Sequence, residues 1–309
     1  MSGVPARLVA ILGPTATGKS DLGVELAEEL GGEVLNADAM QLYRGMDIGT
    51  AKLTEAERRG VPHHLLDLLE VTESASVAEY QVQARATVEQ VFARGRVPVL
   101  VGGSALYLRS VLDDLRFPGT DPAVRTRLED ELDTLGAAEL HRRLAELDPD
   151  AAANVLVSNG RRIVRALEVI EITGERFSAQ LPEVGEPNYG AALLGLELPT
   201  ETLDARIAER VRRMFDAGLV DEVRGLIDRG LHEGRTASRA VGYQQVLAAL
   251  EGRYDLAHAA EDTAKATRRL VRRQRSWFRR DPRIHWLDGL DDDPVGAAWR
   301  ALHVAWSDG

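Results

Sequence analysis

Residues 13–20 read Gly-Pro-Thr-Ala-Thr-Gly-Lys-Ser, which is the spacing of a phosphate-binding loop. The loop follows an apolar run, Leu8 to Leu12, and precedes a helical pattern that starts near Asp21. Two glycines let the backbone curl so that successive N–H groups point inward, and the following helix adds its positive N-terminal end. The sequence therefore predicts a strand, loop and helix that together bind a di- or triphosphate.

The lysine content singles out one residue of this loop. Of 38 basic residues only Lys19, Lys52 and Lys265 are lysines. A compact ammonium fits inside a ring of backbone amides, whereas a guanidinium is bulky and planar. The Ser20 hydroxyl is placed to ligate Mg²⁺, the expected cofactor. The loop is typical of nucleotide-binding and ATP-binding proteins and does not by itself identify the phosphate. Its predicted contacts to a diphosphate come from Gly13, Pro14, Thr15, Ala16, Thr17, Gly18, Lys19 and Ser20.

Apolar runs that resemble buried strands recur along the chain, with helical patterns between most of them. This alternation predicts an α/β fold of the P-loop NTPase kind, with a parallel sheet flanked by helices on both faces. The first three runs are followed directly by the phosphate loop, by Asp38 and by Gly102-Gly103. All three motifs therefore fall at the carboxyl ends of strands, where ligands of such sheets bind. The five runs are Leu8 to Leu12, Glu33 to Ala37, Val97 to Val101, Leu193 to Leu198 and Ile284 to Leu287.

Residues 118–187 contain no strand pattern. Helical stretches occur there at 124–135, 138–147 and 161–172, which predicts an inserted all-helical subdomain. We therefore expect residues 1–117 and 188–309 to form the catalytic core and residues 118–187 to form the insertion. Two long Arg-rich helices, around 203–216 and 257–280, are expected to flank the sheet.

Composition and charge narrow the class of protein. The chain has no cysteine, which excludes disulfides and thiolate metal sites and favours an intracellular compartment. No apolar run approaches the length of a transmembrane helix, so we expect a cytoplasmic protein that does not bind membranes. The net charge is −11, yet residues 265–283 carry nine basic groups and one acid. This segment either faces a polyanion, with Trp277 and Phe278 available for stacking, or is an amphipathic helix whose arginines are solvated or paired.

Several further residues are candidates with more than one interpretation. Asp38 ends a strand and could lie near the metal, act as a general base, or cap a helix. His63 and His64 are adjacent and point in different directions, which disfavours a shared metal and favours packing and local hydrogen bonds. Gly102-Gly103-Ser104 predicts a tight turn near a ligand. Arg161 and Arg165 lie on one side of a helix, as a phosphate clamp or as surface charge; Arg162 accompanies them.

Seven motifs together resemble the bacterial tRNA dimethylallyltransferase family, and the likeness runs in family order from residue 8 to about residue 287. Such an ordered set is far more specific than a phosphate loop alone. The motifs are GPTATGKS (13–20), NADAMQLYRGMDIGTAK (36–52), HHLLD (63–67), VGGSALY (101–107), RRIVRALEV (161–169), SRAVGYQQ (238–245) and ATRRLVRRQRSWF (266–278).

The resemblance implies transfer of the dimethylallyl group of dimethylallyl diphosphate to N6 of the adenosine 3′ of the anticodon, with Mg²⁺ present and diphosphate released. It implies that Asp38 is the general base, that Thr17 lies beside the reacting end of the allyl substrate, and that Arg210 contacts the diphosphate. The adenine would have to be extruded from the anticodon loop. The implied partner is the tRNA anticodon stem-loop, and a monomer is expected. The implied tRNA contacts come from both predicted domains: Asp38, Ala39, Met40, Gln41, Ser104, Arg125, Arg161, Arg162, Arg165, Arg239, Gly242 and Tyr243.

Three positions depart from the family pattern. Many relatives have Ser at the position of Ala39, an acid at that of Gly160 and a basic residue at that of Gln244. The first departure removes one hydroxyl contact, and the third puts a phosphate contact from Gln244 in doubt.

Three other functions are compatible with the same phosphate loop. A P-loop small-molecule kinase would use ATP, with Asp38 accepting a hydroxyl proton. An enzyme that prenylates free adenine nucleotides would need little surface for tRNA. A non-catalytic P-loop RNA-binding protein would not depend on Asp38 for any activity.

Overall fold

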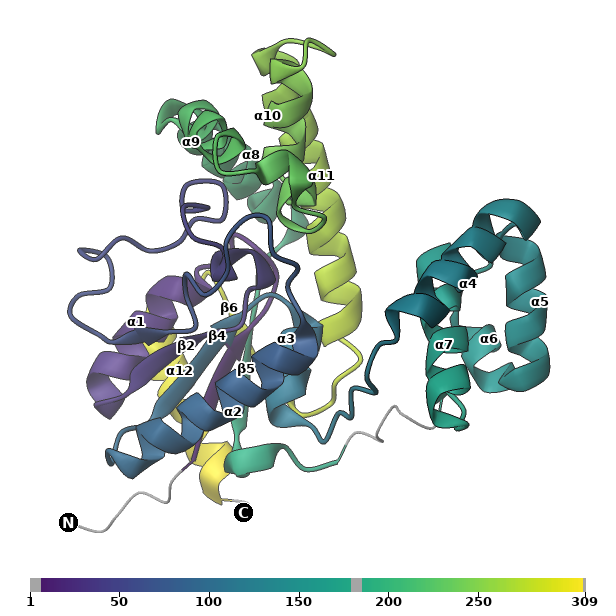
Figure 1. Cartoon of the computed structure of the whole chain (residues 1–309). Helices are drawn as coiled ribbons and strands as arrows, with labels where there is room; N and C mark the ends of the chain where they lie inside the picture. The colour runs from purple at the N-terminus through teal and green to yellow at the C-terminus, as the bar shows by residue number, and fades with distance from the viewer. Residues whose placement is uncertain (1–6, 179–184, 308–309) are drawn as a thin grey trace. The chain divides into compact units, whose positions relative to one another are not determined.

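The computed structural model describes residues 7–178 and 185–307. Six parallel strands form one sheet in the order β3-β2-β4-β1-β5-β6 (Figure 1). The five apolar runs are strands, with limits within one residue of those predicted, so the parallel α/β fold is confirmed. The strands are β1 Val9–Leu12, β2 Glu33–Asn36, β3 His63–His64, β4 Pro98–Gly102, β5 Ala192–Glu197 and β6 Ile284–Asp288.

The central strand shows why these runs are continuously apolar. β1 pairs with β4 on one side and β5 on the other, so that Ile11 lies beside Val101 and Leu194. All four residues of β1 are buried. A parallel strand covered by helices on both faces has no solvent side, and its sequence therefore does not alternate between apolar and polar residues.

Helices cover both faces of the sheet, and successive strand residues face them in turn. Leu8, Ala10 and Leu12 pack in one cluster with α2 (Val77–Ala93) and α3 (Ala105–Leu112). Val9 and Ile11 pack in another with α1 (Lys19–Leu30) and α12 (Pro294–Ser307). This two-residue period follows from the geometry of a strand. The three-layer arrangement leaves the carboxyl ends of the strands as the place where loops gather.

A further group of helices completes this part of the chain. It consists of α8 (Thr200–Asp216), α9 (Leu219–Ile227), α10 (Tyr243–Leu250) and α11 (Leu256–Phe278), which Figure 1 shows together near the top of the view. The two long Arg-rich helices were predicted. Figure 1 also shows that α11 runs from this group down beside the sheet, where it contacts α3.

The chain divides into two compact units, residues 1–112 with 186–309 and residues 113–185. The limits predicted from sequence, 117/118 and 187/188, lie close to these. The second unit has its own apolar core, and its described residues contain no strand. Its helices are α4 (Pro122–Leu135), α5 (Ala137–Leu147), α6 (Pro149–Asn154) and α7 (Gly160–Thr173), of which α6 was not predicted.

Within residues 7–178 and 185–307, no helix combines the length and the apolar character needed to span a bilayer.

Candidate active site

The phosphate loop connects β1 to α1, and its two glycines are required by the backbone. Gly13 has a φ of 143°, and a Cβ there would lie 2.6 Å from the carbonyl oxygen of Leu196. Gly18 has a φ of 95° and is the N-cap of α1. Because positive φ strains other residues, only glycine lets the chain turn from the sheet into the helix here.

Lys19 is held over this loop in a partly buried position. Its ammonium donates a hydrogen bond to the carbonyl oxygen of Pro14 at 2.5 Å. Burial, and then the nearby charge of Arg210, lower the pKa of Lys19 to about 7, and Asp38 opposes this. The charged ammonium is therefore only partly compensated by the protein, and a bound anion would favour it.

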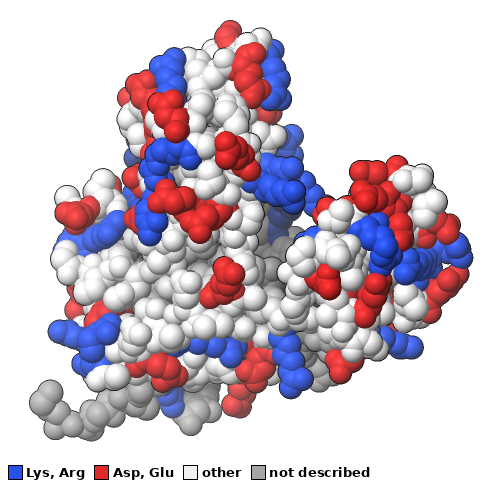
Figure 2. Space-filling model, in the orientation of Figure 1, with Lys and Arg blue, Asp and Glu red and all other residues white. Residues whose placement is uncertain are grey.

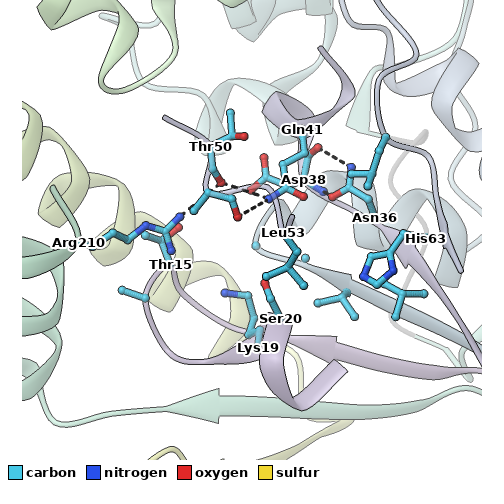
Figure 3. Close-up of a pocket in the computed structure, with 17 residues that line it drawn as sticks. Thr15, Lys19, Ser20, Asn36, Asp38, Gln41, Thr50, Leu53, His63 and Arg210 are labelled. Atoms are coloured by element: carbon cyan, nitrogen blue, oxygen red, sulfur yellow. Dashed lines mark hydrogen bonds between the residues drawn. The ribbon is translucent and has the colours of Figure 1, made fainter. Parts of the chain in front are cut away.

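A polar pocket opens beside the loop. Lys19 and Ser20 line it from α1, Asp38 lines it from the end of β2, and Arg210 lines it from α8. Figure 3 shows these side chains directed into the same space. Burial lowers the pKa of Arg210, while Asp38 acts in the opposite direction. Two cations and one carboxylate thus face a pocket whose chemistry suits a polyphosphate anion.

Asp38 is a helix cap, which is one of the interpretations that its position allowed, and its roles as a base or near the metal stay predictions. Its Oδ1 accepts a hydrogen bond from the backbone N–H of Met40 at 2.9 Å, which caps a 3-10 turn over Ala39–Leu42. The side chain nevertheless lines the pocket. Asn36 holds the Asp38 backbone from both sides: its Oδ1 accepts from the Asp38 N–H at 2.9 Å, and its Nδ2 donates to the Asp38 carbonyl at 3.0 Å. The cap therefore fixes the carboxylate instead of excluding it from chemistry.

A larger, mostly apolar cavity of about 560 Å³ adjoins the polar pocket. Its walls come from α3, α8 and α11 and include Leu106, Tyr107, Met214 and Trp277. The residues that line both spaces are Thr15, Asp38, Thr50, Gly103 and Arg210. Polar and apolar spaces therefore meet at the Asp38 carboxylate and the Arg210 guanidinium.

The predicted Gly102-Gly103-Ser104 turn closes this junction. A Cβ on Gly102 would lie 2.3 Å from the Ala37 carbonyl oxygen, so glycine lets the ends of β2 and β4 approach each other. The Ser104 hydroxyl accepts a 3.4 Å hydrogen bond from the Ala39 N–H. The turn thereby ties the segment that carries Asp38 to α3.

Sequence reasoning did not single out Glu222, which holds a loop of the site. Its carboxylate accepts hydrogen bonds from three successive backbone N–H groups, those of Asp47, Ile48 and Gly49, at 3.0, 2.7 and 3.2 Å. The Thr50 carbonyl that follows accepts from the Gln41 amide at 3.2 Å and from Arg210 at 3.4 Å. No local motif marks Glu222, since it lies more than 170 residues from the loop.

Lys52 holds the same loop from the opposite end. Its side chain is 3% exposed, and its ammonium donates to the carboxylates of Asp47 and Asp67, each at 2.6 Å, and to the Tyr43 carbonyl at 3.0 Å. The low lysine count was the available signal, because a chain that otherwise uses arginine retains lysine here too.

The two histidines make local hydrogen-bonded contacts, as expected. His63 lines the polar pocket, and its Nδ1 lies 2.9 Å from the Val61 carbonyl oxygen; burial lowers its pKa. The Nε2 of His64 lies 2.6 Å from Glu33. Among the described residues, no three His, Cys, Asp or Glu side chains are grouped as metal ligands would be.

The remaining loop residues shape the site without lining its walls. Gly13, Pro14, Thr17 and Gly18 belong to the loop, but none of them lines the polar pocket or the apolar cavity. The Thr17 side chain is buried and its hydroxyl donates to the Pro14 carbonyl at 2.9 Å. Its predicted place beside the allyl substrate stays a prediction.

The predicted tRNA contacts of the first unit fall into two groups. Ala39, Met40, Ser104 and Arg239 line the apolar cavity, as Asp38 does, and Gln41 lines the polar pocket. Gly242 and Tyr243 are buried instead. Tyr243 is 0% exposed, so its side chain supports the structure behind the cavity, and contact with tRNA there stays a prediction.

The predicted contacts of the second unit also differ in their partners. Arg125 and Arg165 both pair with Glu168, a carboxylate with no exposed surface. Arg165 also donates to the Pro118 carbonyl at 2.6 Å. Within the described part of the chain, the side chains of Arg161 and Arg162 form no ion pair and no hydrogen bond. Two of the four arginines thus organise the unit, and two keep their charge available.

The Arg-rich segment resolves into paired and unpaired side chains. Arg275 and Arg279 pair with Glu197, and Arg268 pairs with Asp204 at 3.5 Å. Of the described arginines on and after α11, Arg272, Arg273 and Arg280 are exposed and form no ion pair. Figure 2 shows basic side chains gathered at the position of α11. The segment is therefore an amphipathic helix with paired and solvated arginines, and its contact with a polyanion stays a prediction.

One departure from the family pattern has a physical reason. A Cβ on Gly160 would lie 2.7 Å from Leu132 of α4, so an acidic side chain here would require Leu132 to move. Gln244 is exposed on α10, and the Ala39 N–H is bonded to Ser104 as described above.

Both the sequence and the fold are similar to those of known proteins. The model of the IPP transferase family matches residues 41–281. The chain is 68% identical to the tRNA dimethylallyltransferase of Saccharopolyspora erythraea over 286 residues, covering 93% of this chain and 92% of that protein. The crystal structure of a tRNA isopentenylpyrophosphate transferase from Bacillus halodurans matches with a TM-score of 0.73 and 38% identity, covering 98% and 97% of the two chains. A eukaryotic dimethylallyltransferase described as acting on tRNA matches with a TM-score of 0.80 and 26% identity, covering 96% of this chain and 77% of that one.

A family model that spans most of the chain and relatives this similar over nearly its whole length, on the same fold, leave one assignment: this chain belongs to the IPP transferase family.

Proposed function

We propose that this protein transfers the dimethylallyl group of dimethylallyl diphosphate to N6 of the adenosine 3′ of the anticodon in tRNA. The observation that carries the proposal is the junction of a polar, cation-lined pocket with an apolar cavity at Asp38 and Arg210. A prenyl diphosphate has one anionic and one hydrocarbon end, and its reacting carbon joins them. The names of the similar proteins support the same reaction.

The residues at the junction match the parts of the reaction. N6 attacks C1 of the allyl group, the C1–O bond breaks, and its electron pair leaves with the diphosphate. Lys19, the loop amides and Arg210 would stabilise the departing anion. The Asp38 carboxylate would accept the proton that N6 loses. An exocyclic amine is a weak nucleophile, so holding both groups in place is a large part of the catalysis.

The donor set also fits Mg²⁺. Mg²⁺ binds one or two protein oxygens together with substrate phosphates and water, and Ser20 and Asp38 are oxygen donors on the wall of one pocket. Ser20 would hold the ion, with Asp38 near it. When bound, Mg²⁺ would neutralise charge on the leaving diphosphate.

The unpaired arginines of α11 support tRNA as the acceptor. Arg273 and Trp277 line the apolar cavity, and Arg272 lies beside them on the helix. Guanidinium groups bind phosphates, and an aromatic ring offers a surface on which a base can stack. A kinase or an enzyme for free nucleotides would have less use for such a face.

The test is an incubation of the purified protein with Mg²⁺, dimethylallyl diphosphate and unmodified tRNA, followed by mass spectrometry of the tRNA nucleosides. N6-dimethylallyladenosine is the expected product. Parallel reactions replace tRNA by AMP, or the prenyl donor by ATP. Prenylated AMP without prenylated tRNA would favour the free-nucleotide enzyme, and phosphoryl transfer from ATP without any prenylated nucleoside would overturn the proposal.

A further inference from the structure

Gln274 of α11 joins two loops of the site through one side-chain amide. Its Oε1 accepts a hydrogen bond from the backbone N–H of Thr15 at 3.0 Å, and its Nε2 donates to the carbonyl oxygen of Gly103 at 2.9 Å. A Cβ on Gly103 would lie 2.6 Å from Nε2, so glycine makes room for the amide. The three residues are distant in sequence, and each half of the amide has its own backbone partner.

The position of Thr15 gives this contact a consequence for the phosphate loop. Thr15 lines both the polar pocket and the apolar cavity. A phosphate loop acts through the direction of its backbone N–H groups. Because Gln274 bonds one of these groups, the orientation of α11 helps to set the shape of the loop at the junction.

The same stretch of α11 faces the apolar cavity. Arg273, Gln274 and Trp277 all line it, and Arg272 and Arg273 have no ion-pair partner among the described residues. An RNA phosphate bound by these arginines would fix α11 at the position of Gln274. This helix thus contacts the loop that would hold the diphosphate and the cavity that would receive the allyl group and the acceptor base.

We propose that Gln274 is a positioning residue that couples the two substrates, so that RNA bound at α11 strengthens the binding of diphosphate in the phosphate loop. The inference rests on the proposed function. By linkage, the factor by which RNA tightens diphosphate binding equals the factor by which diphosphate tightens RNA binding.

The experiment measures this factor by calorimetry, with inorganic diphosphate and Mg²⁺ as one ligand and an unmodified anticodon stem-loop RNA as the other. We expect the RNA to lower the Kd of diphosphate by roughly 5- to 100-fold in the wild type, the usual range of such coupling. Gln274→Met keeps the length of the side chain and removes both hydrogen bonds. Because the contact between α11 and the two loops is then lost, its coupling factor is expected to fall to about one. Gln90→Met, on the exposed face of α2, is the matched control and keeps the wild-type factor.

A role in stability alone would weaken each ligand separately and leave the factor unchanged, and that result would overturn the inference. A wild type without coupling would overturn it too. If Gln274→Met does not fold, Gln274→Glu replaces it: the carboxylate can still accept from Thr15 but repels the Gly103 carbonyl, and the factor should again be lost. Absence of prenylated tRNA with the wild type would instead refute the proposed function.

Discussion

The carboxylate of Glu222 accepts a hydrogen bond from the Tyr243 hydroxyl at 2.5 Å, and both residues support the loop at residues 47–49. Burial raises the pKa of Tyr243, and the neighbouring Glu222 charge raises it further, so the hydroxyl stays a donor. A Cβ on Gly49 would lie 2.4 Å from the Tyr243 ring, which shows how closely the loop packs on it.

Replacing Glu222 should therefore loosen the loop. We expect Glu222→Ala to lower the free energy of unfolding by about 2 to 4 kcal/mol, since several charge-assisted hydrogen bonds are lost. Tyr243→Phe should cost about 1 kcal/mol. Urea unfolding of both variants and of the double variant gives the coupling between them. Strictly additive effects would show that the observed hydrogen bond contributes nothing.

Asp38→Asn distinguishes the role of Asp38 as a helix cap from its proposed role as a general base. The amide oxygen can still accept from the Met40 N–H, but the side chain no longer accepts a proton at neutral pH. Turnover should fall by roughly 10²- to 10⁴-fold, the usual contribution of a general base, while tRNA affinity and melting temperature stay near wild type. Single-turnover prenylation and filter binding measure the two quantities. Retention of turnover would remove Asp38 as the base.

Lys19 should give stability a characteristic pH dependence. Its pKa is about 7 in the folded protein against 10.5 for an ordinary lysine. The unfolded state therefore binds more protons between these values, and stability due to this group rises with pH from about 7 to about 10.5. Below pH 7 the charged ammonium destabilises the fold by its full amount.

This pH dependence is tested by comparing the free energy of unfolding of the wild type with that of Lys19→Met, whose side chain cannot titrate. Without diphosphate, the variant should be the more stable protein at pH 6 to 7, and its advantage should shrink as the pH approaches 10. Denaturant unfolding across this range measures the difference, and Lys265→Met, at an exposed lysine, is the control. A difference that does not change with pH would contradict the lowered pKa. Diphosphate should restore stability to the wild type and not to the variant.

The unpaired arginines predict the salt dependence of tRNA binding. Arg272→Gln and Arg280→Gln should each weaken binding and reduce the slope of log K against log salt by about 0.7 to 0.9, the contribution of one phosphate contact. Arg300→Gln, on α12, removes an exposed arginine elsewhere and should leave the slope unchanged. Slopes come from titrations at several salt concentrations. If all three variants behave alike, Arg272 and Arg280 have no special role in binding the RNA.

Much of the fold could be predicted because buried parallel strands are continuous apolar runs. β3 was missed because two residues, His63–His64, form no recognisable pattern. α6 and α12 were missed although each begins with a proline that follows an aspartate, a helix start signal. In both, the aspartate accepts from a backbone N–H three residues on, that of Ala151 or of Gly296. These two helices were therefore within reach of sequence reasoning.

The contacts that support the site could not be predicted from the sequence. The phosphate loop and Asp38 belong to local motifs, and the structure brings them together with Arg210 in one pocket. Glu222 and Gln274 act through single hydrogen-bonded contacts with residues far away in the chain. A lone polar residue on a helix has no period or spacing that identifies its partner, so only the folded structure reveals these two.

The chain leaves the first unit and returns to it at nearly the same point. The Asn188 amide donates to the Val111 carbonyl at 3.4 Å, on either side of residues 113–185. Because the points at which the first unit is left and re-entered are adjacent, the length of the insertion can change without displacing any strand of the sheet. The insertion can therefore be replaced by another segment, in evolution or by design, while the residues of the candidate active site keep their positions.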